Sequence, residues 1–432
     1  MALSVVILAA GQGSRMKSSK PKVLHEISGK AMLFFVIDAA KLISDDITVI
    51  LYHKSDLIRE EIEQYYKNIS FHIQNAEEFP GTGGAMMGVN IKHDRALILN
   101  GDMPLVTKDS LELLASTDES SINMSVLMMD NPTGYGRVII EDGKVKQIVE
   151  EKDCTTEQKK IKTVNAGVYC VSKSILEKFI PKLNNNNAQK EYYLTDIVAM
   201  AVADGQTVQA VIVKEEEFKG VNSKLDLANA ERIMQNRIKD KLMIQGVTMR
   251  LPETIYIDSH ASFEGECILE NGVSIIGRSH ISHSHIKAHT VIEESEITNS
   301  DIGPMARIRP ASIIEGTHIG NFTEVKKSHL KGVKAGHLSY IGDSEIDEGS
   351  NIGAGTITCN YDGKNKYKTV IGKNVFVGSD SQLIAPVNIG DNVIIAAGTT
   401  VTEDILSGEL AISRHKLSRV KDFFDRFFKK DE

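Results

Sequence analysis

The sequence lacks the features that would place the chain in a membrane or outside a reducing compartment. It has no run of about 18 apolar residues, so we expect no membrane-spanning helix. Its first residues, MALSVVILAAGQGSRM, carry no positive charge before the apolar stretch, which argues against a signal peptide. The 4 cysteines are scattered without a CxxC pair. This spacing argues against a metal or redox cluster and favours a cytoplasmic location.

The sequence also lacks an excess of positive charge. Its net charge is −8 over 432 residues, whereas binding along a nucleic-acid backbone requires a basic surface. We therefore expect no nucleic-acid partner, although a local cluster of Lys and Arg can still hold one anion. The 41% hydrophobic and 25% charged residues are typical of a folded globular protein. The length predicts two or three domains.

The chain divides into two regions of different pattern, joined by one helical segment. Residues 1–222 alternate short apolar runs with helix-like segments, which predicts an α/β domain with a Rossmann-like, mostly parallel sheet covered on both faces. The candidate strands are Ser4–Ala10, Ile47–Tyr52 and Arg95–Asn100. Residues 223–243 contain no Gly or Pro and predict one long helix that links two domains. A surface helix of the first domain remains the alternative.

Residues 244–432 have a different repeat. From roughly Pro252 to Asp404, glycine is frequent and aliphatic residues recur at short intervals. Six of them are spaced six residues apart: Ile371, Val377, Leu383, Ile389, Ile395 and Val401. No α-helix keeps a period of six on one face, whereas a parallel β-helix does. We predict a left-handed parallel β-helix, a projecting polar loop at 358–368, and a tail with a short helix at Ser418–Phe428.

The strongest chemical signal is the stretch LAAGQGSRM that begins at Leu8 and is followed by Pro21-Lys22. A buried strand ends there at a Gly-rich turn, whose backbone can approach an anion closely and point N–H groups at it. Arg15 and Lys22 can neutralise the charge of a triphosphate. The alternative is an ordinary strand–turn–helix with two surface cations. The combination favours a phosphate-binding turn.

These residues resemble the nucleotidyltransferases that make sugar nucleotides from sugar 1-phosphates. Further matching segments follow in the family's order: Pro80–Gly83, Leu99–Pro104, Gly134–Arg137, Val149–Asp153, Val164–Gly167, Glu191–Asp196 and Gly220–Asn222. The resemblance implies catalytic roles for Arg15 and Lys22. It also implies that UTP or the UDP-sugar contacts Leu8, Ala9, Ala10, Gly11, Lys22, Gln74, Gly81, Thr82, Asp102, Gly136, Glu150, Asn165 and Asn222. Asn75 remains the alternative to Gln74 for reading the base.

The resemblance further implies that Asp102 and Asn222 hold a magnesium ion. A carboxylate and an amide oxygen suit this hard cation, together with phosphate oxygens and water. Taken alone, Asp102 is an acid at the end of a strand, and such residues are often only turn formers or helix caps. The chain departs from the family's usual pattern at Gly84, Asn100 and Ala166.

A β-helix beside such a domain is either an assembly scaffold or an acyltransferase. Seven segments favour the acyltransferase: 306–310, 315–328, 334–346, 351–369, 375–380, 395–402 and 411–414. They resemble the bacterial bifunctional N-acetylglucosamine-1-phosphate uridyltransferase / glucosamine-1-phosphate acetyltransferase family, and with the first domain the resemblance covers nearly the whole chain. It implies acetylation of glucosamine 1-phosphate by acetyl-CoA, then UMP transfer from UTP with release of pyrophosphate. The product would be UDP-N-acetylglucosamine, a precursor of peptidoglycan and lipopolysaccharide.

The resemblance also nominates the residues of acetyl transfer. His337 matches the general base, and histidine has a suitable pKa for taking a proton from a sugar amine. The sugar phosphate would be held by Arg309, Lys326, Tyr340, Asn351 and Lys366. Acetyl-CoA would contact Ala354, Asn360, Tyr361, Ser379, Ala397 and Arg414. A homotrimer with acetyl sites between subunits is implied as well. A nucleotidyltransferase with a purely structural β-helix, and a regulator with inactive sites, remain alternatives.

Overall fold

The computed structural model describes residues 2–116, 121–133, 135–149, 151, 154–187 and 189–428. The chain forms two compact units, Met1–Gln235 and Asn236–Glu432. The division falls within helix α7, which spans Lys224–Ile244. Among the described residues, no helix is long and apolar enough to cross a membrane.

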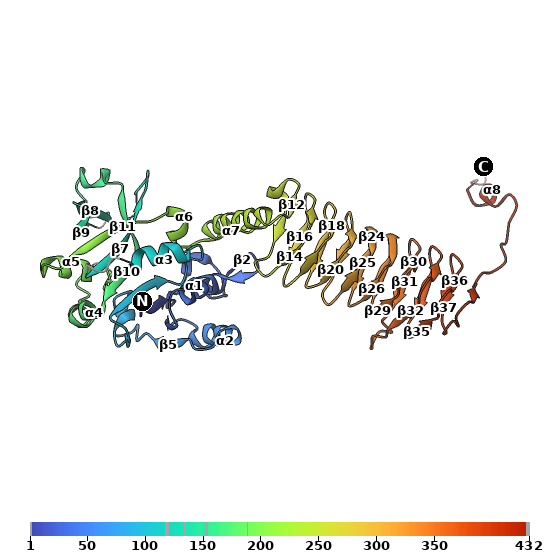
Figure 1. Ribbon diagram of the computed structural model, residues 1–432, viewed down its shortest axis with the longest axis horizontal. Coiled ribbons are helices and arrows are strands. Elements are labelled where there is room, and N and C mark those ends of the chain that lie inside the picture. The colour runs from blue at the N-terminus through green and yellow to red at the C-terminus, as the bar shows by residue number, and fades with distance from the viewer. Residues whose placement is uncertain are drawn as a thin grey trace. The chain divides into compact units, whose positions relative to one another are not determined.

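In the first unit, the described strands form one mixed nine-stranded sheet (Figure 1). Its order is β5 (Ser70–Ile73), β4 (Asp46–Leu51), β1 (Ser4–Leu8), β6 (Arg95–Asn100), β10 (Thr163–Ser172), β7 (Ile122–Met128), β11 (Val208–Ile212), β9 (Lys144–Val149) and β8 (Arg137–Glu141). The pairings from β5 to β6 are parallel, as is that of β7 with β11. Strand β10 runs antiparallel to β6 and β7. A separate short hairpin pairs β2 (Glu26–Ile27) with β3 (Lys30–Ala31).

Helices cover both faces of this sheet, as predicted. Alternation along β1 sends Val5 and Ile7 to one core and Val6 to the other. The first core includes residues of α1 (Met32–Lys41), α2 (Ser55–Tyr65), α3 (Lys108–Ala115) and α6 (Glu215–Phe218). The second includes residues of α4 (Lys173–Phe179) and α5 (Asp196–Ala203). The α/β prediction is confirmed.

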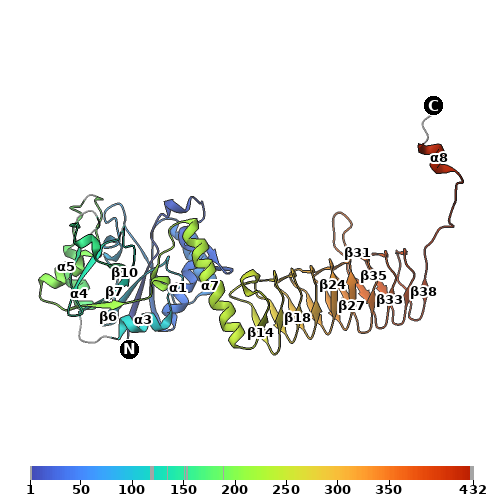
Figure 2. The same ribbon diagram turned by 90° about the horizontal axis from the view of Figure 1, so that it is seen from above.

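The second unit is a left-handed parallel β-helix with three faces, as predicted (Figure 2). The first face contains β12 (Thr248–Met249), β15 (Ile268–Leu269), β18 (His285–Ile286), β21 (Asp301–Ile302), β24 (His318–Asn321), β27 (Lys334–His337), β30 (Asn351–Ile352), β33 (Phe376–Val377), β36 (Ile394–Ile395) and β38 (Leu410–Ala411). The second face contains β13 (Tyr256–Ile257), β16 (Ser274–Ile276), β19 (Val291–Glu293), β22 (Arg307–Ile308), β25 (Glu324–Lys326), β28 (Tyr340–Gly342), β31 (Ile357–Cys359), β34 (Gln382–Ile384) and β37 (Thr400–Val401). The third face contains β14 (Ser262–Glu264), β17 (His280–Ser282), β20 (Glu296–Thr298), β23 (Ile313–Glu315), β26 (His329–Lys331), β29 (Ser344–Ile346), β32 (Thr369–Ile371) and β35 (Val387–Ile389).

Aliphatic side chains fill the interior of the coils. On the first face, Ile302 pairs with Ile319 and Ile319 with Ala335, so each residue lies above its counterpart one coil later. All three are fully buried. Each coil therefore covers the core of the next one, which is the physical reason for the hexapeptide repeat.

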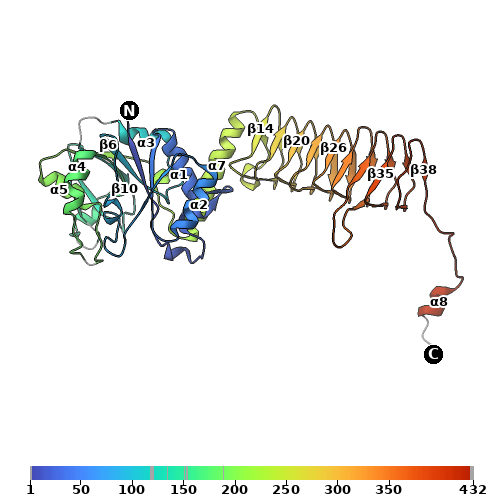
Figure 3. The same ribbon diagram turned by 90° about the horizontal axis from the view of Figure 1, so that it is seen from below.

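Two predictions about irregular segments have different outcomes. The loop after β31 projects from the coils (Figures 2 and 3), closed by a bridge between Tyr361 and Lys366, as predicted. The helix predicted at Ser418–Phe428 is shorter, because α8 spans only Phe423–Phe428. Asp422 has φ 58, a left-handed conformation that an α-helix excludes, so the helix begins after it.

Candidate active sites

The phosphate-binding turn follows β1 at the carboxyl edge of the sheet. The Leu8 carbonyl accepts a hydrogen bond from Gly101 N, and Ala9 N donates to Ile50 O at 2.9 Å. Gly13 has φ 64, and a Cβ there would lie 2.5 Å from Lys22 Cβ. Glycine is therefore required for Lys22 to approach the turn. The next short helix, Ser14–Met16, carries Arg15.

Lys22 lies at the centre of a polar cluster built from three distant segments. Its ammonium donates to the Asp102 carboxylate and, at 2.6 Å, to Asn222 Oδ1. The Lys22 and Asp102 side chains are only 12% and 19% exposed. The two oxygens thus converge on one cation, with Val221 N bonded to Asp102 O at 2.9 Å. This donor pair suits a magnesium ion that completes its coordination with phosphate and water.

Arg15 joins this cluster through Asn222, because its guanidinium donates to Asn222 Oδ1 at 2.8 Å. Asn222 N and Ser223 N both donate to Asp226 Oδ2, which fixes the loop before α7. Burial opposes the charge on Asp226, but these hydrogen bonds and that of the Ser223 hydroxyl hold the pKa of Asp226 below its usual value. The loop is therefore held by a charged carboxylate.

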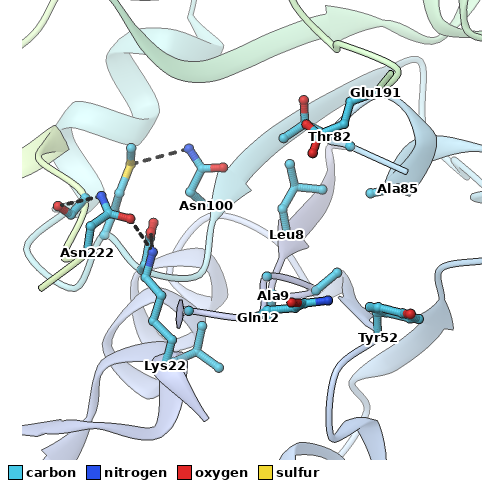
Figure 4. Close-up of a pocket in the computed structure, with 18 of the residues that line it drawn as sticks. Leu8, Ala9, Gln12, Lys22, Tyr52, Thr82, Ala85, Asn100, Glu191 and Asn222 are labelled. Atoms are coloured by element: carbon cyan, nitrogen blue, oxygen red, sulfur yellow. Dashed lines mark hydrogen bonds and ion pairs between the residues drawn. The ribbon is translucent and has the colours of Figure 1, made fainter. Parts of the chain in front are cut away.

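A cleft of ≈ 780 Å³ opens beside the turn (Figure 4). The predicted residues that line it are Leu8, Ala9, Ala10, Gly11, Lys22, Gln74, Gly81, Thr82, Asp102, Asn165 and Asn222. Two predicted residues, Arg15 and Gly136, are not among the residues that line the cleft. Each is hydrogen-bonded to one that is: the Arg15 guanidinium donates to Asn222 Oδ1, and the Gly136 carbonyl accepts from Asn165 N at 3.2 Å. Glu150 lies outside the residues that the structure describes.

The loop that carries Gly81 and Thr82 is anchored by Gln74. The Gln74 side-chain amide donates to Phe79 O at 2.9 Å and to Gly81 O at 3.0 Å. Asn75 instead bonds Glu78 at 3.0 Å and is exposed. A Cβ at Gly84 would lie 2.1 Å from Phe79 O, so this loop path requires glycine at that position. Of the two candidate base-reading residues, Gln74 lines the cleft and Asn75 is not among its lining residues.

Strand β10 contributes Asn165 through an irregularity. Its register with β7 shifts between Asn165 and Tyr169, and such bulges re-aim side chains beside active sites. Asn165 Oδ1 accepts from Gly167 N at 2.8 Å, and Asn100 Nδ2 donates to Gly167 O at 3.1 Å. Asn100, one of the departures from the family pattern, therefore supports the backbone beside Asn165.

Sequence reasoning missed several lining residues: Gln12, Tyr52, Leu127, Phe218 and Lys219. Tyr52 follows β4 directly. In open α/β sheets, ligands bind beyond the carboxyl ends of the strands. That rule, applied to the predicted strand Ile47–Tyr52, is the signal that could have identified it.

In the second unit, three cations predicted to hold a sugar phosphate form one basic cluster: Arg309, Lys326 and Lys366. The pKa of Lys326 lies below the ordinary lysine value, because the Lys366 ammonium stands beside it and Arg309 adds further positive charge. Arg309 also donates to Glu324 at 2.9 Å, and mainly this bond raises the pKa of Arg309. Like charges repel, so an anion bound here would relieve the cluster.

Three of the residues predicted to contact acetyl-CoA are aligned with His337 on the coils that follow it, next to the first face. The register aligns Ala335 with Ile352, Ile352 with Val377 and Val377 with Ile395. Two residues further on in each coil are His337, Ala354, Ser379 and Ala397, which we call the His337 column. Backbone bonds of 2.8 Å (Asp380 N to Ala354 O) and 2.9 Å (Gly398 N to Ser379 O) join its coils.

The remaining predicted residues lie on the first and second faces, in the projecting loop and in the tail. Asn351 pairs with Lys334 on the first face. Tyr340 is the first residue of β28, a strand of the second face, and follows His337 by three residues in the chain. Asn360 is buried and bonds the Asp343 carboxylate. Tyr361 stands exposed in the projecting loop, and Arg414 is exposed in the tail. The pairing of Ile395 with Ala411 makes Ser413 the residue that follows Ala397 in the His337 column, and Arg414 is the next residue in the chain.

Comparisons with known proteins agree with the folds of the two units. Residues 5–141 match the family model of the MobA-like NTP transferase domain, and residues 368–403 match that of the bacterial transferase hexapeptide (six repeats). Among the relatives of this chain are three named Bifunctional protein GlmU. That of a Sulfurovum species is 67% identical over 99% of each chain, and that of Sulfurimonas denitrificans is 61% identical over 99% of each. That of a Nitratiruptor species is 59% identical over 100% of each.

Identity of this extent covers both units and every segment that carries the two sites. The chain therefore belongs to the family of bifunctional GlmU proteins, transferases that combine a uridyltransferase with an acetyltransferase.

Proposed function

We propose that residues 1–222 transfer UMP to N-acetylglucosamine 1-phosphate and residues 244–432 acetylate glucosamine 1-phosphate, with residues 223–243 as the linking helix. The observation that carries the first assignment is the convergence of Lys22, Asp102 and Asn222 beside the phosphate-binding turn. The basic cluster of Arg309, Lys326 and Lys366 supports the second, because a sugar phosphate carries negative charge. The product of the second reaction is the substrate of the first.

Uridylyl transfer depends on positioning and on neutralising phosphate charge. An oxygen of the sugar 1-phosphate forms a bond to the α-phosphorus of UTP, the bond from that phosphorus to the bridging oxygen breaks, and pyrophosphate leaves. The turn from Leu8 to Gly11 presents backbone N–H groups to the phosphates, while Lys22 and Arg15 supply positive charge. Gln74, Gly81 and Thr82 contact the base. Asn165, Gly136 and Glu150 contact the sugar.

We propose magnesium at Asp102 and Asn222. Their two oxygens already hold one cation, the Lys22 ammonium, and among the described residues there is no group of three acidic, His or Cys side chains for an all-protein site. When bound, magnesium would neutralise charge that develops on the phosphate oxygens. Lys22 would then be free to contact a phosphate.

Acetyl transfer requires a neutral amine. We propose that His337 takes a proton from the amine nitrogen of glucosamine 1-phosphate as that nitrogen bonds the acetyl carbonyl carbon. The carbon–sulfur bond breaks, the proton held by His337 passes to the leaving sulfur, and coenzyme A leaves as the thiol. Tyr340, Asn351 and the basic cluster hold the sugar phosphate. Ala354, Asn360, Tyr361, Ser379, Ala397 and Arg414 contact acetyl-CoA.

We propose that the enzyme is a homotrimer whose acetyl sites lie between subunits. Phe376, Ile394 and Leu410 align on consecutive coils of the first face and are 52%, 51% and 59% exposed. A contiguous exposed apolar stripe is typical of an interface. Ile394→Asp should lower the mass measured by light scattering from that of a trimer toward that of a monomer. We also place the enzyme in the cytoplasm, where UTP and acetyl-CoA are both present and its free thiols are kept reduced.

Metal removal tests the two-site assignment. With glucosamine 1-phosphate, acetyl-CoA and UTP, the protein should release both free thiol and pyrophosphate. Addition of EDTA should stop pyrophosphate release, because the magnesium at Asp102 and Asn222 is lost, and leave thiol release unchanged. Pyrophosphate release that continues in EDTA, or thiol release that stops with it, would contradict the assignment.

A further inference from the structure

Tyr52 occupies a fixed position between two parts of the nucleotide cleft. It follows Leu51, the last residue of β4. The Ile50 carbonyl accepts a hydrogen bond from Ala9 N at 2.9 Å, and the Leu51 carbonyl accepts one from Gln74 N at 2.9 Å. The chain just before Tyr52 is therefore bonded on one side to the phosphate-binding turn and on the other to the segment of Gln74.

The side chain of Tyr52 faces the cleft. It lines the ≈ 780 Å³ cavity together with Gln12, Ala76 and Ala85, and it is 36% exposed. In Figure 4 the ring lies near Ala9 and Gln12 and below Ala85, apart from Lys22 and Asn222. The cleft thus presents an uncovered aromatic ring at a place distinct from its cations.

The ligands of this cleft contain one group that an aromatic ring suits. The triphosphate and the sugar phosphate carry negative charge and belong with Lys22, Arg15 and the turn. The sugar is rich in hydroxyls and has no flat π-system. Uracil has one, and stacking of a base on an aromatic side chain is a recurrent mode of nucleotide recognition.

We propose that Tyr52 packs its ring against the uracil of UTP and forms one wall of the base site. The inference rests on the proposed function, because it requires UTP in this cleft. The proposal assigns different roles to Gln74 and Tyr52. Gln74 and the loop it anchors offer hydrogen bonds, which read the identity of the base, whereas Tyr52 offers a flat surface that every base can use. Tyr52 therefore determines nucleotide affinity and contributes little to the choice of base.

Calorimetric titration of the full-length protein separates these roles. Tyr52→Ala should weaken UTP binding by about 5- to 150-fold, the usual effect of deleting a stacking side chain. Tyr52→Phe keeps the ring and should bind UTP like the wild type. Affinity for pyrophosphate, which has no base, should be unchanged in both variants. In kinetics, the KM for UTP should rise in Tyr52→Ala, while the KM for N-acetylglucosamine 1-phosphate and the rate of thiol release stay constant.

Tyr65→Ala is the matched control, because Tyr65 is 57% exposed and is not a lining residue of the cleft. It should bind UTP like the wild type. Three results would overturn the proposal: unchanged UTP affinity in Tyr52→Ala, an equal loss in Tyr52→Phe, or a parallel loss of pyrophosphate affinity. Wild-type protein that binds no UTP would instead refute the proposed function itself.

Discussion

The two units assemble their sites in different ways. In the first unit, one chain brings Lys22 together with Asp102, 80 residues away, and Asn222, 200 residues away, in a cleft where Lys22 and Asp102 are mostly buried. In the second unit, His337 is exposed on the coils, the Arg309 side chain is 38% exposed, and Lys366 reaches the basic cluster from the projecting loop. A sheet domain can therefore draw distant segments into one cleft, whereas a solenoid presents its side chains on an exposed surface.

His337→Ala should cause the largest difference between the rates of the two reactions. Loss of a general base costs about 10²–10⁴-fold in rate, so thiol release should fall by that factor. Pyrophosphate release from UTP and N-acetylglucosamine 1-phosphate should stay unchanged, because the cleft contains none of the His337 column. An equal fall in both products, measured in parallel assays, would contradict two separate sites.

The Lys366→Met variant tests whether repulsion within the basic cluster controls the pH dependence of sugar-phosphate binding. Lys326 has a lowered pKa because Lys366 and Arg309 disfavour its charged form. Affinity for glucosamine 1-phosphate should therefore decline as pH rises through a value below that of an ordinary lysine. Lys366→Met removes the main repulsion, so the decline should begin at higher pH, while affinity at neutral pH falls by about tenfold through loss of one charge-assisted contact.

The control is Lys364→Met, in the same loop but without a described effect on Lys326. It should leave the pH profile of binding, measured by calorimetry, unchanged. An identical profile in Lys366→Met and wild type would show that the two ammonium groups do not share a ligand.

The smallest expected effect is a change in the KM for UTP, which distinguishes the neighbouring residues Gln74 and Asn75. Gln74→Ala removes the anchor of the loop and should raise the KM for UTP by about tenfold, through two lost hydrogen bonds. Asn75→Ala, the matched control, should stay within about two-fold of wild type, because Asn75 is exposed and bonds Glu78. The reverse order would make Asn75 the base-reading residue.

Sequence reasoning predicted what has a local chemical or periodic signature. The Gly-rich turn with Arg15 and Lys22, the β-helix and the projecting loop all depend on neighbouring residues, and the structure has each of these features. Tyr52 was missed because no motif marks it, and only its place at the carboxyl end of a predicted strand could have indicated that it faces a ligand. The direction of β10 could not be predicted either, since strand direction depends on which distant partners pair. The start of α8 was wrong by five residues, because a single left-handed Asp422 interrupts an otherwise helical pattern.

We propose that the cleft and the exposed column are separate active sites on one chain. Asp102→Ala tests it most directly, with thiol and pyrophosphate followed in one reaction containing glucosamine 1-phosphate, acetyl-CoA, UTP and magnesium. We expect thiol release at the wild-type rate and pyrophosphate release lowered by about 10²–10³-fold. Pyrophosphate release at the wild-type rate, or a loss of both products together, would contradict it.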